Sequence, residues 1–191
     1  MSQVLTRNKT VSSDGESLIL VDGDDRELGF LDKSACHDGA GVLHRAFSLF
    51  VFNEHGELLI QQRAEDKRLW PSYWSNSCCS HPRRGETMET AVGRRLEEEL
   101  GLNILLRYLY KFEYSASFGD LGTEHELCSV YTGFAGNEPV INTAEIASWQ
   151  WIDRDLLTSQ LDAEPERFTP WFKMEWERLR REFPIALRVP E

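Results

Sequence analysis

Residues 70–102 read WPSYWSNSCCSHPRRGETMETAVGRRLEEELGL, and the two halves of this stretch differ in character. The first half is rich in Pro, Ser and Asn, which favour loops, yet it carries tryptophans, two adjacent cysteines and a histidine. The second half repeats apolar residues at the spacing of a helix. The stretch therefore predicts a reactive loop that leads directly into a helix bearing several carboxylates.

The helix is expected from Glu86 to Leu100, and Gly101 is a usual C-terminal stop. Its buried stripe recurs at every fourth residue: Met88, Val92, Leu96 and Leu100. Glu99 falls inside this stripe, and a carboxylate on a buried face needs a cation or a metal ion as its partner. An ion pair with Arg95, one turn earlier, and a role as a metal or ligand contact both remain open.

The bulk composition is that of a soluble globular protein, with 41% hydrophobic and 28% charged residues. A length of 191 residues fits one domain, expected over residues 17–191, after a loose polar arm at residues 1–16. The chain shows no membrane span and no signal peptide, so a cytoplasmic location is expected. The net charge of −11 argues against nucleic acid as a partner but does not exclude a small anionic substrate, and a monomer is the favoured state.

The remaining patterns predict a sheet. Two hairpins are expected, one from SLILVDG and ELGFLDK, the other from VLHRAFSLFVF and ELLIQQRA around the turn NEHG. Further strands are expected at about 108–117 and 124–134 and in SWQWID, followed by a helix from Trp171 to about Phe183, with Thr169 as its N-cap. The order predicts an α+β domain with a mixed or antiparallel sheet and helices packed on it.

In the strand at 124–134, alternation places Glu124, Glu126 and Cys128 on one face and His125 on the other. Two neighbouring carboxylates repel each other if both are ionised and dry, which is typical of a cation site. An exposed sheet edge would tolerate them equally well, so both interpretations stay open at this point.

The four cysteines show no C-x-x-C spacing, and a reducing compartment would keep them as thiols. Cys36, Cys78 and Cys128 are expected to be small buried hydrophobic residues.

Six segments of the chain carry a resemblance to a known family: LDKSACHD, LHRAFSLFVFN, QQRAEDKRLWPSYWSNSCCSHP, GETMETAVGRRLEEELG, EHELCSVY and FTPW. Together they resemble the type I isopentenyl-diphosphate isomerases, which share a scaffold with the Nudix hydrolases. The resemblance covers nearly the whole chain from about Leu18. It implies a Nudix-like α/β/α sandwich, and an enzyme that interconverts isopentenyl and dimethylallyl diphosphate by a 1,3 proton shift through a tertiary carbocation.

The resemblance also implies two metal sites. A Zn²⁺ or Mn²⁺ ion would be held by three histidines and two carboxylates: His37, His44, His81, Glu124 and Glu126. A Mg²⁺ ion at Glu99 would bridge to the diphosphate of the substrate. The positions that match the family's diphosphate contacts are Lys33, Arg63, Lys67 and Arg95, each of which would otherwise be a surface or paired charge.

By the same resemblance, Cys79 and Glu126 lie on opposite faces of the substrate and exchange protons with it. We expect Glu126, hydrogen-bonded to Tyr114, to deliver the proton, and Cys79 to remove one as a thiolate whose pKa is lowered by the metal and His81. Trp171 is expected to face the carbocation with its ring, whereas Trp70 and Trp74 are expected to form wall and core.

The main alternative is a Nudix hydrolase that cleaves a nucleoside diphosphate linkage. When the hydrolase motif is aligned on Gly101, the chain keeps Glu86, Arg94, Leu96, Glu98, Glu99 and Leu102 but has Ser80 for a glycine. It also has Arg95 where the motif has a glutamate, which replaces a metal-binding carboxylate by a cation and points away from hydrolysis. A Nudix-like binding module without activity would be expected to lack Cys79, Tyr114 or Glu126, and none is lost.

Overall fold

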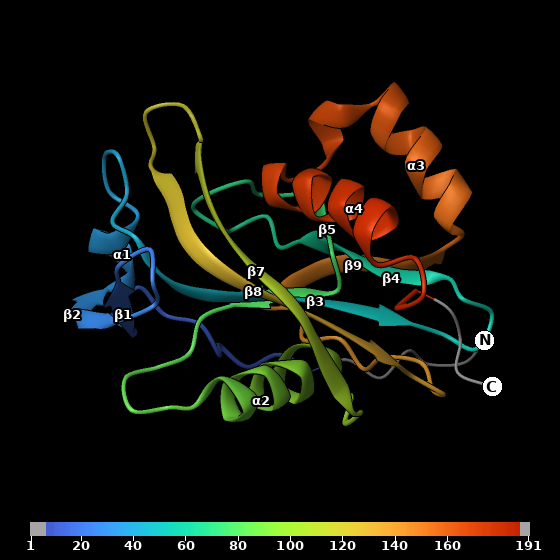
Figure 1. Cartoon of the computed structure of the whole chain (residues 1–191), viewed down its shortest axis with the longest axis horizontal. Coiled ribbons are helices and arrows are strands. Elements are labelled where there is room, and N and C mark those ends of the chain that lie inside the picture. Colours follow the sequence, from blue (N-terminus) through green and yellow to red (C-terminus); the bar gives the residue numbers. More distant parts are fainter. Residues whose placement is uncertain (1–6, 188–191) are drawn as a thin grey trace.

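The computed structural model describes residues 7–187, in which one mixed sheet of nine strands lies between helices (Figure 1). The strands are β1 (Ser17–Val21), β2 (Glu27–Asp32), β3 (His44–Phe52), β4 (Leu58–Arg63), β5 (Trp74–Ser75), β6 (Cys78–Ser80), β7 (Leu106–Ser117), β8 (Thr123–Phe134) and β9 (Ile146–Ile152). The helices are α1 (Lys33–Cys36), α2 (Met88–Leu100), α3 (Arg154–Ala163), a 3₁₀ turn η1 (Pro165–Arg167) and α4 (Pro170–Glu182).

Strand β3 is the centre of the sheet. It pairs with β8 in parallel over its whole length, and with β1, β4 and β6 in antiparallel fashion. The β1–β2, β7–β8 and β4–β9 pairs are also antiparallel. The sheet is therefore mixed, and both expected hairpins are confirmed, although β3 and β4 pair only next to their turn, at Phe52 and Leu58.

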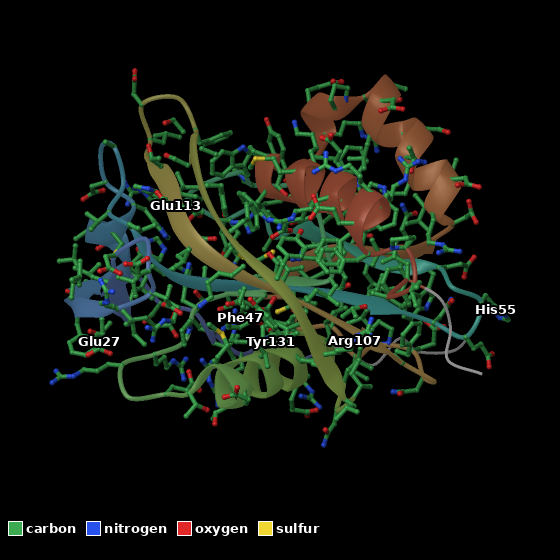
Figure 2. All side chains as sticks on the ribbon, in the orientation of Figure 1. Glu27, Phe47, His55, Arg107, Glu113 and Tyr131 are labelled. Atoms are coloured by element: carbon green, nitrogen blue, oxygen red, sulfur yellow. The ribbon has the colours of Figure 1, made fainter. Side chains whose placement is uncertain are left out.

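The helices cover both faces of the sheet, with α2 on one side and α3 and α4 on the other (Figure 1). Alternation along β3 sends Phe47, Leu49 and Val51 to the core with α2, and Ala46, Phe50 and Phe52 to the core with α4. In Figure 2 the side chains of Phe47 and Tyr131 lie on the α2 side, whereas His55 lies at the tip of the β3–β4 turn. The predicted α/β/α sandwich is thereby confirmed.

Helix α2 begins two residues later than expected, because the side chain of Thr87 caps it by accepting a hydrogen bond from the backbone N–H of Thr90. It ends as expected at Gly101, whose φ of 63° is in the left-handed region that glycine adopts without strain. The buried face of α2 includes Glu99 and also Arg95, so the carboxylate predicted to lie in the stripe is buried together with a cation.

Five elements were not predicted from the sequence: α1, β5, β6, α3 and the 3₁₀ turn η1. Strand β6 lies inside the Pro- and Ser-rich stretch and forms only because β3 offers it a partner. Helix α3 buries only Leu157, so its apolar periodicity is too weak to stand out. At α4, Thr169 occupies the N-cap position but its hydroxyl contacts Ser75 instead of capping the helix.

The expected N-terminal arm is in part packed against the domain. Residues 1–6 lie outside the described part of the chain. Arg7 bridges to Asn142, and the carbonyl of Val11 accepts hydrogen bonds from Arg83 and Arg95. These contacts therefore attach the segment from Arg7 onward to the rest of the domain. Among residues 7–187, no helix is both long and apolar enough to cross a membrane.

Candidate active site

A cavity of about 220 Å³ brings most of the predicted site residues together. Its wall contains the side chains Lys33, His37, Arg63, Lys67, Cys79, His81, Arg95, Glu99, Tyr114, Glu124, Glu126 and Trp171. His44 is the one predicted site residue outside this wall, because it is fully buried directly behind it. Elements spread over more than 130 residues of sequence thus meet at one place.

The register of the sheet builds the deep end of this cavity. His44 on β3 lies beside Glu126 on β8, and Tyr114 on β7 lies on the other side of Glu126. Because side chains alternate along a strand, Glu124 shares the face of Glu126, and the imidazole of His125 points to the opposite face and contacts Glu113. The predicted facing of the β8 residues is confirmed.

The other two histidines are supplied by connections. His81 follows β6, and His37 follows the single turn of α1. The carbonyl of His37 accepts a hydrogen bond from the backbone N–H of Thr123 at 2.9 Å, which ties this loop to β8. A Cβ atom on Gly122 would lie 2.4 Å from that carbonyl oxygen, so the close approach requires glycine there.

These five side chains form a compact cluster, with one nitrogen or oxygen from each within 4.8 Å of the others. His81 Nε2 lies 2.8 Å and His44 Nε2 lies 3.7 Å from Glu126 Oε1. His37 Nε2 lies 3.0 Å from Glu124 Oε2 and 3.4 Å from His44 Nε2. All five residues are buried.

The donor chemistry of the cluster fits a metal ion. His44 Nδ1 donates to the carbonyl of Val42 at 2.7 Å, which leaves the lone pair of its Nε2 facing the cluster, as in metal-bound histidines. Among the described residues, Glu124 Oε2 has no partner in hydrogen-bonding geometry although His37 lies within ion-pair distance. Several lone pairs thus converge on one buried point, which a divalent cation would satisfy.

Cys79 lies on the α4 side of the sheet, next to this cluster. Strand β6 pairs Cys79 with Ser48, and the Cys79 Sγ atom contacts the Ser48 hydroxyl at 3.4 Å and donates to Asn76 Oδ1 at 2.8 Å. The neighbouring Cys78 points to the α2 side, where its thiol donates to Glu99 at 3.3 Å. The strand alternation thus separates the two adjacent cysteines, and only Cys79 lines the cavity.

Burial and neighbouring side chains shift the pKa values of the two proton-exchanging groups. Burial raises the pKa of the Cys79 thiol. Burial alone would raise the pKa of Glu126, but His44 and His81 lower it well below its usual range. Burial thus favours the thiol form of Cys79, and the two histidines favour the ionised form of Glu126.

Tyr114 and Trp171 complete the deep end. The Tyr114 hydroxyl donates to Glu126 Oε2 at 2.6 Å, the contact predicted from the sequence. The indole of Trp171 is 3% exposed, donates to Ser75 at 3.1 Å and packs edge-on against Trp70. Trp171 is thus both a core residue and part of the cavity wall, and the guanidinium of Arg63 lies 5.4 Å from its ring centre.

The opposite end of the cavity is rich in paired charges. Arg95 forms a buried ion pair with Glu99, with Nη2 2.5 Å from Oε1, and its Nη2 also lies 3.4 Å from Glu145. Lys67 donates to the same carboxylate of Glu145. The ion pair left open by the sequence therefore exists, and since both partners line the cavity it does not exclude a ligand contact.

Lys33 and Arg63 extend this basic end. The Lys33 ammonium donates to the Ser12 hydroxyl, and burial together with the nearby Lys67 lowers its pKa. Arg63 is held by the carbonyls of Trp70 and Leu69, each at 3.0 Å. All four basic residues predicted to bind the diphosphate thus face one cavity.

Several site residues were missed from the sequence. Glu145 precedes β9 and shares no motif with the residues it contacts, and its buried pairing with Lys67 and Arg95 depends on long-range folding. Gln61 lines the cavity with a side-chain oxygen that has no partner among residues 7–187. Asn76 and Ser48 form hydrogen bonds with Cys79. In the sequence, only their polar character within or beside apolar segments could have pointed to them.

The part of α2 that matches the Nudix hydrolase motif is internally paired. Arg94 contacts Glu86 at 2.7 Å and Glu98 at 2.9 Å, so Arg94 connects the middle of the helix to the loop that precedes it. Arg95, which stands in place of a motif glutamate, occupies the buried position next to Glu99. The carboxylate cluster expected of the hydrolase is interrupted there by a cation.

Comparison with known proteins agrees with this arrangement. A model of the NUDIX domain matches residues 42–172. Isopentenyl-diphosphate Delta-isomerase 1 of Photorhabdus laumondii is 45% identical over 163 residues, covering 84% of this chain and 93% of the relative. The isopentenyl-diphosphate Delta-isomerase of Serratia proteamaculans is 45% identical over 158 residues, covering 82% and 87%.

Solved structures show the same fold at lower identity. A crystal structure of a Deinococcus radiodurans protein superposes with a TM-score of 0.71 at 24% identity, covering 85% of this chain and 98% of that one. A MutT protein from Methanosarcina mazei gives a TM-score of 0.60 at 18% identity, covering 73% and 94%. The chain therefore belongs to the Nudix superfamily and, within it, to the family of isopentenyl-diphosphate Delta-isomerases.

Proposed function

We propose that this protein interconverts isopentenyl diphosphate and dimethylallyl diphosphate by a 1,3 proton shift. The observation that carries the proposal is that Cys79 and Glu126, two groups able to exchange protons, line one cavity whose other end is basic. The similarity to named isomerases at 45% identity over most of the chain supports the same reaction. The product would supply isoprenoid biosynthesis. Since all four cysteines are free thiols, we also propose a cytoplasmic location.

The protein's own groups would carry out the proton shift. An alkene is a weak base, so one group must donate a proton to the terminal carbon while the other removes a proton from the allylic carbon. Cys79 and Glu126 would fill these two roles and exchange them in the reverse reaction. With the proton resting on Cys79, the forward reaction would begin with donation by the thiol, the reverse of the assignment expected from the sequence.

Two neighbours would support the reaction at the deep end. Tyr114 would orient Glu126 through Oε2, since the other oxygen already faces His81 and His44. The buried ring of Trp171 would face the tertiary carbocation and stabilise it by a cation–π interaction of about 2 kcal/mol when desolvated. The dry aromatic wall would also keep water away from the cation.

Metal ions would complete both ends of the site. Residues His37, His44, His81, Glu124 and Glu126 would hold one Zn²⁺ or Mn²⁺ ion, whose positive charge would stabilise the carboxylates and fix their orientation. Glu99 would contact a Mg²⁺ ion bound with the diphosphate, and Lys33, Arg63, Lys67 and Arg95 would bind the phosphate oxygens. The small diphosphate substrate is the partner we expect.

Hydrolysis of a nucleoside diphosphate is the less supported alternative. The position of Arg95 in a buried pair with Glu99 argues against it, because this cation replaces a carboxylate that the hydrolases use. Cys79 and Tyr114 would have no task in phosphate cleavage, although both line the cavity.

An assay of both activities tests the proposal. The protein is incubated with Mg²⁺ and either isopentenyl diphosphate or a nucleoside diphosphate sugar, while proton NMR follows the alkene and phosphorus NMR follows the diphosphate group. Conversion of the alkene with the diphosphate intact supports the isomerase. Cleavage of the nucleoside substrate without alkene conversion would establish the hydrolase instead.

A further inference from the structure

Glu175, in the middle of α4, is a buried carboxyl group that the proton shift described above does not use. The residue is 0% exposed and faces the sheet. Among the described residues, Oε2 has no hydrogen-bond partner, and Oε1 accepts a hydrogen bond from the Cys128 thiol at 3.6 Å. The Ser48 hydroxyl also lies close enough to interact with this carboxyl group. No cation among residues 7–187 compensates it, and an ionised carboxylate is very unfavourable in such surroundings, so burial favours the neutral form near pH 7.

A chain of polar atoms connects Glu175 to Cys79. From Glu175 Oε1 it runs 3.6 Å to Cys128 Sγ, then 3.4 Å to Ser48 Oγ, then 3.4 Å to Cys79 Sγ. The sheet brings these atoms together, since Ser48 on β3 pairs with Cys79 on β6, and Cys128 on β8 pairs with the β3 residue two positions before Ser48. Neither Ser48 nor Glu175 is among the residues that line the cavity.

The hydrogen bonds around Cys79 have a defined direction. Asn76 Nδ2 donates to the carbonyls of Leu49 and Cys78, which turns Oδ1 of Asn76 toward Cys79. The Cys79 thiol therefore donates to Asn76, and a lone pair of its sulfur faces the Ser48 hydroxyl. That hydroxyl proton can point either at the sulfur or toward Glu175.

The charge on Glu175 decides between these orientations. A neutral carboxyl group leaves the Ser48 proton free to point at Cys79, whereas a carboxylate would attract the same proton away from it. Whenever Cys79 gives up a proton in either direction of the reaction, negative charge develops on its sulfur, and a hydroxyl donor aimed at that sulfur stabilises it.

We propose that Glu175 is a positioning residue, which by remaining uncharged keeps the Ser48 hydroxyl directed at the sulfur of Cys79. This inference rests on the proposed isomerase function, since it assigns Glu175 a part in the same proton exchange. Because Glu175 acts through Ser48 and does not line the cavity, it affects turnover and not substrate binding.

The pH range of this effect follows from the surroundings of Glu175. Burial raises the pKa of Glu175 to about 8, and hydrogen bonding from Ser48 and Cys128 opposes this only in part. The charged or titratable groups that face it or its neighbours are Cys79, Tyr110, Glu126, Cys128 and Arg178. Burial raises the pKa of the thiols and the phenol, while Glu126 is already ionised, so Glu175 is the group in this set that changes charge near pH 8.

The experiment compares kcat and KM from pH 6 to 10 in the wild type, Glu175→Gln, Glu175→Leu, Ser48→Ala and the double variant Ser48→Ala/Glu175→Leu. We expect wild-type kcat to fall as the pH rises through about 8, and the neutral Glu175→Gln to keep its activity without that fall. Ser48→Ala should lower kcat roughly tenfold at unchanged KM, the loss of one hydrogen bond to a charged group. Glu175→Leu, which cannot attract the Ser48 proton either, should keep its activity without the fall near pH 8. Since Glu175 acts only through this hydroxyl, the double variant should have the kcat of Ser48→Ala at every pH.

Glu177→Gln, an exposed carboxylate on the same helix, is the matched control and should match the wild type at every pH. A fall near pH 8 that persists in Glu175→Gln or in Ser48→Ala, or a kcat of the double variant well below that of Ser48→Ala, would each overturn the inference. Should Glu175→Leu fail to fold, the comparison of the wild type with Glu175→Gln still decides. A wild type that converts no isopentenyl diphosphate would overturn the proposed function itself, whereas these variant results in an active enzyme would overturn only the role of Glu175.

Discussion

The hydroxyl group of Tyr114 lies 2.6 Å from Glu126 Oε2, while His81 holds the other oxygen, Oε1, at 2.8 Å. The carboxylate is thus fixed at both oxygens by side chains from two different elements, the β7 strand and the loop after β6. A carboxylate held in this way has one orientation toward the cavity, and this orientation is the basis of the proposed proton exchange.

Removal of the Tyr114 hydroxyl should therefore impair turnover. In Tyr114→Phe the ring still fills its buried position, but Oε2 loses a hydrogen bond to a charged group, worth about 1.5–3 kcal/mol. We expect kcat to fall by about 10- to 100-fold with little change in KM, as measured by steady-state conversion of isopentenyl diphosphate. Tyr108→Phe, an exposed phenol on the same strand, is the control. Full activity in Tyr114→Phe would show that the contact has no part in the reaction.

The two adjacent cysteines provide a matched pair of variants. Cys79 lines the cavity, whereas Cys78 points to the α2 side and contacts Glu99. We expect Cys79→Ser to abolish turnover while inorganic diphosphate still binds in calorimetry, because a serine hydroxyl exchanges protons far less readily than a thiol. Cys78→Ser should retain most of the activity and lose some thermal stability. Equal effects of the two substitutions on kcat would contradict the assignment of Cys79.

The histidine cluster predicts metal-dependent stability. His37→Gln should weaken the binding of Mn²⁺ or Zn²⁺, because it removes a nitrogen from the cluster, whereas His125→Gln on the opposite face should not. A ligand at 100 times its Kd stabilises the folded state by about 2.7 kcal/mol, so chelation should lower the Tm of the wild type and of His125→Gln by several degrees. Calorimetric thermograms with and without chelator measure this. If His37→Gln and His125→Gln bound the ion equally well, the cluster would not be its site.

Glu175 predicts how stability depends on pH. Its pKa is raised from an ordinary value of 4.5 to about 8 in the folded protein. The stability linked to its neutral form is fully present below about pH 4.5 and is lost as the pH rises through about 8, where the buried group ionises. Glu175→Gln cannot ionise, so its urea midpoint should exceed that of the wild type at pH 9 by more than it does at pH 5. A difference that stays constant over this range would mean that Glu175 keeps one charge state throughout.

Short-range patterns predicted much of the fold and of the site. The alternation of β8 alone placed Glu124 and Glu126 on one face and His125 on the other, and the spacing along α2 placed Glu99 in the buried stripe. Such patterns work because a strand or helix fixes the facing of its own side chains whatever it packs against.

What the sequence did not reveal depends on contacts between distant segments. Strand β6 exists because β3 pairs with it, and this pairing sends Cys78 and Cys79 to different sides of the sheet. The partners of Glu145 and Glu175 come from other elements, so nothing near either residue in the sequence marks it as buried. The burial that raises the pKa of the Cys79 thiol depends on distant segments as well, since Ser48, its partner on β3, lies 31 residues earlier in the chain.

The most direct test is the fate of hydrogen in the product. The wild type is incubated with isopentenyl diphosphate and Mg²⁺ in D₂O, and the products are followed by proton and phosphorus NMR. The account predicts dimethylallyl diphosphate with deuterium in a methyl group and an intact diphosphate, formed by the wild type but neither by Cys79→Ala nor by Glu126→Gln. Release of phosphate without deuterated dimethylallyl diphosphate, or undiminished turnover in either variant, would contradict it.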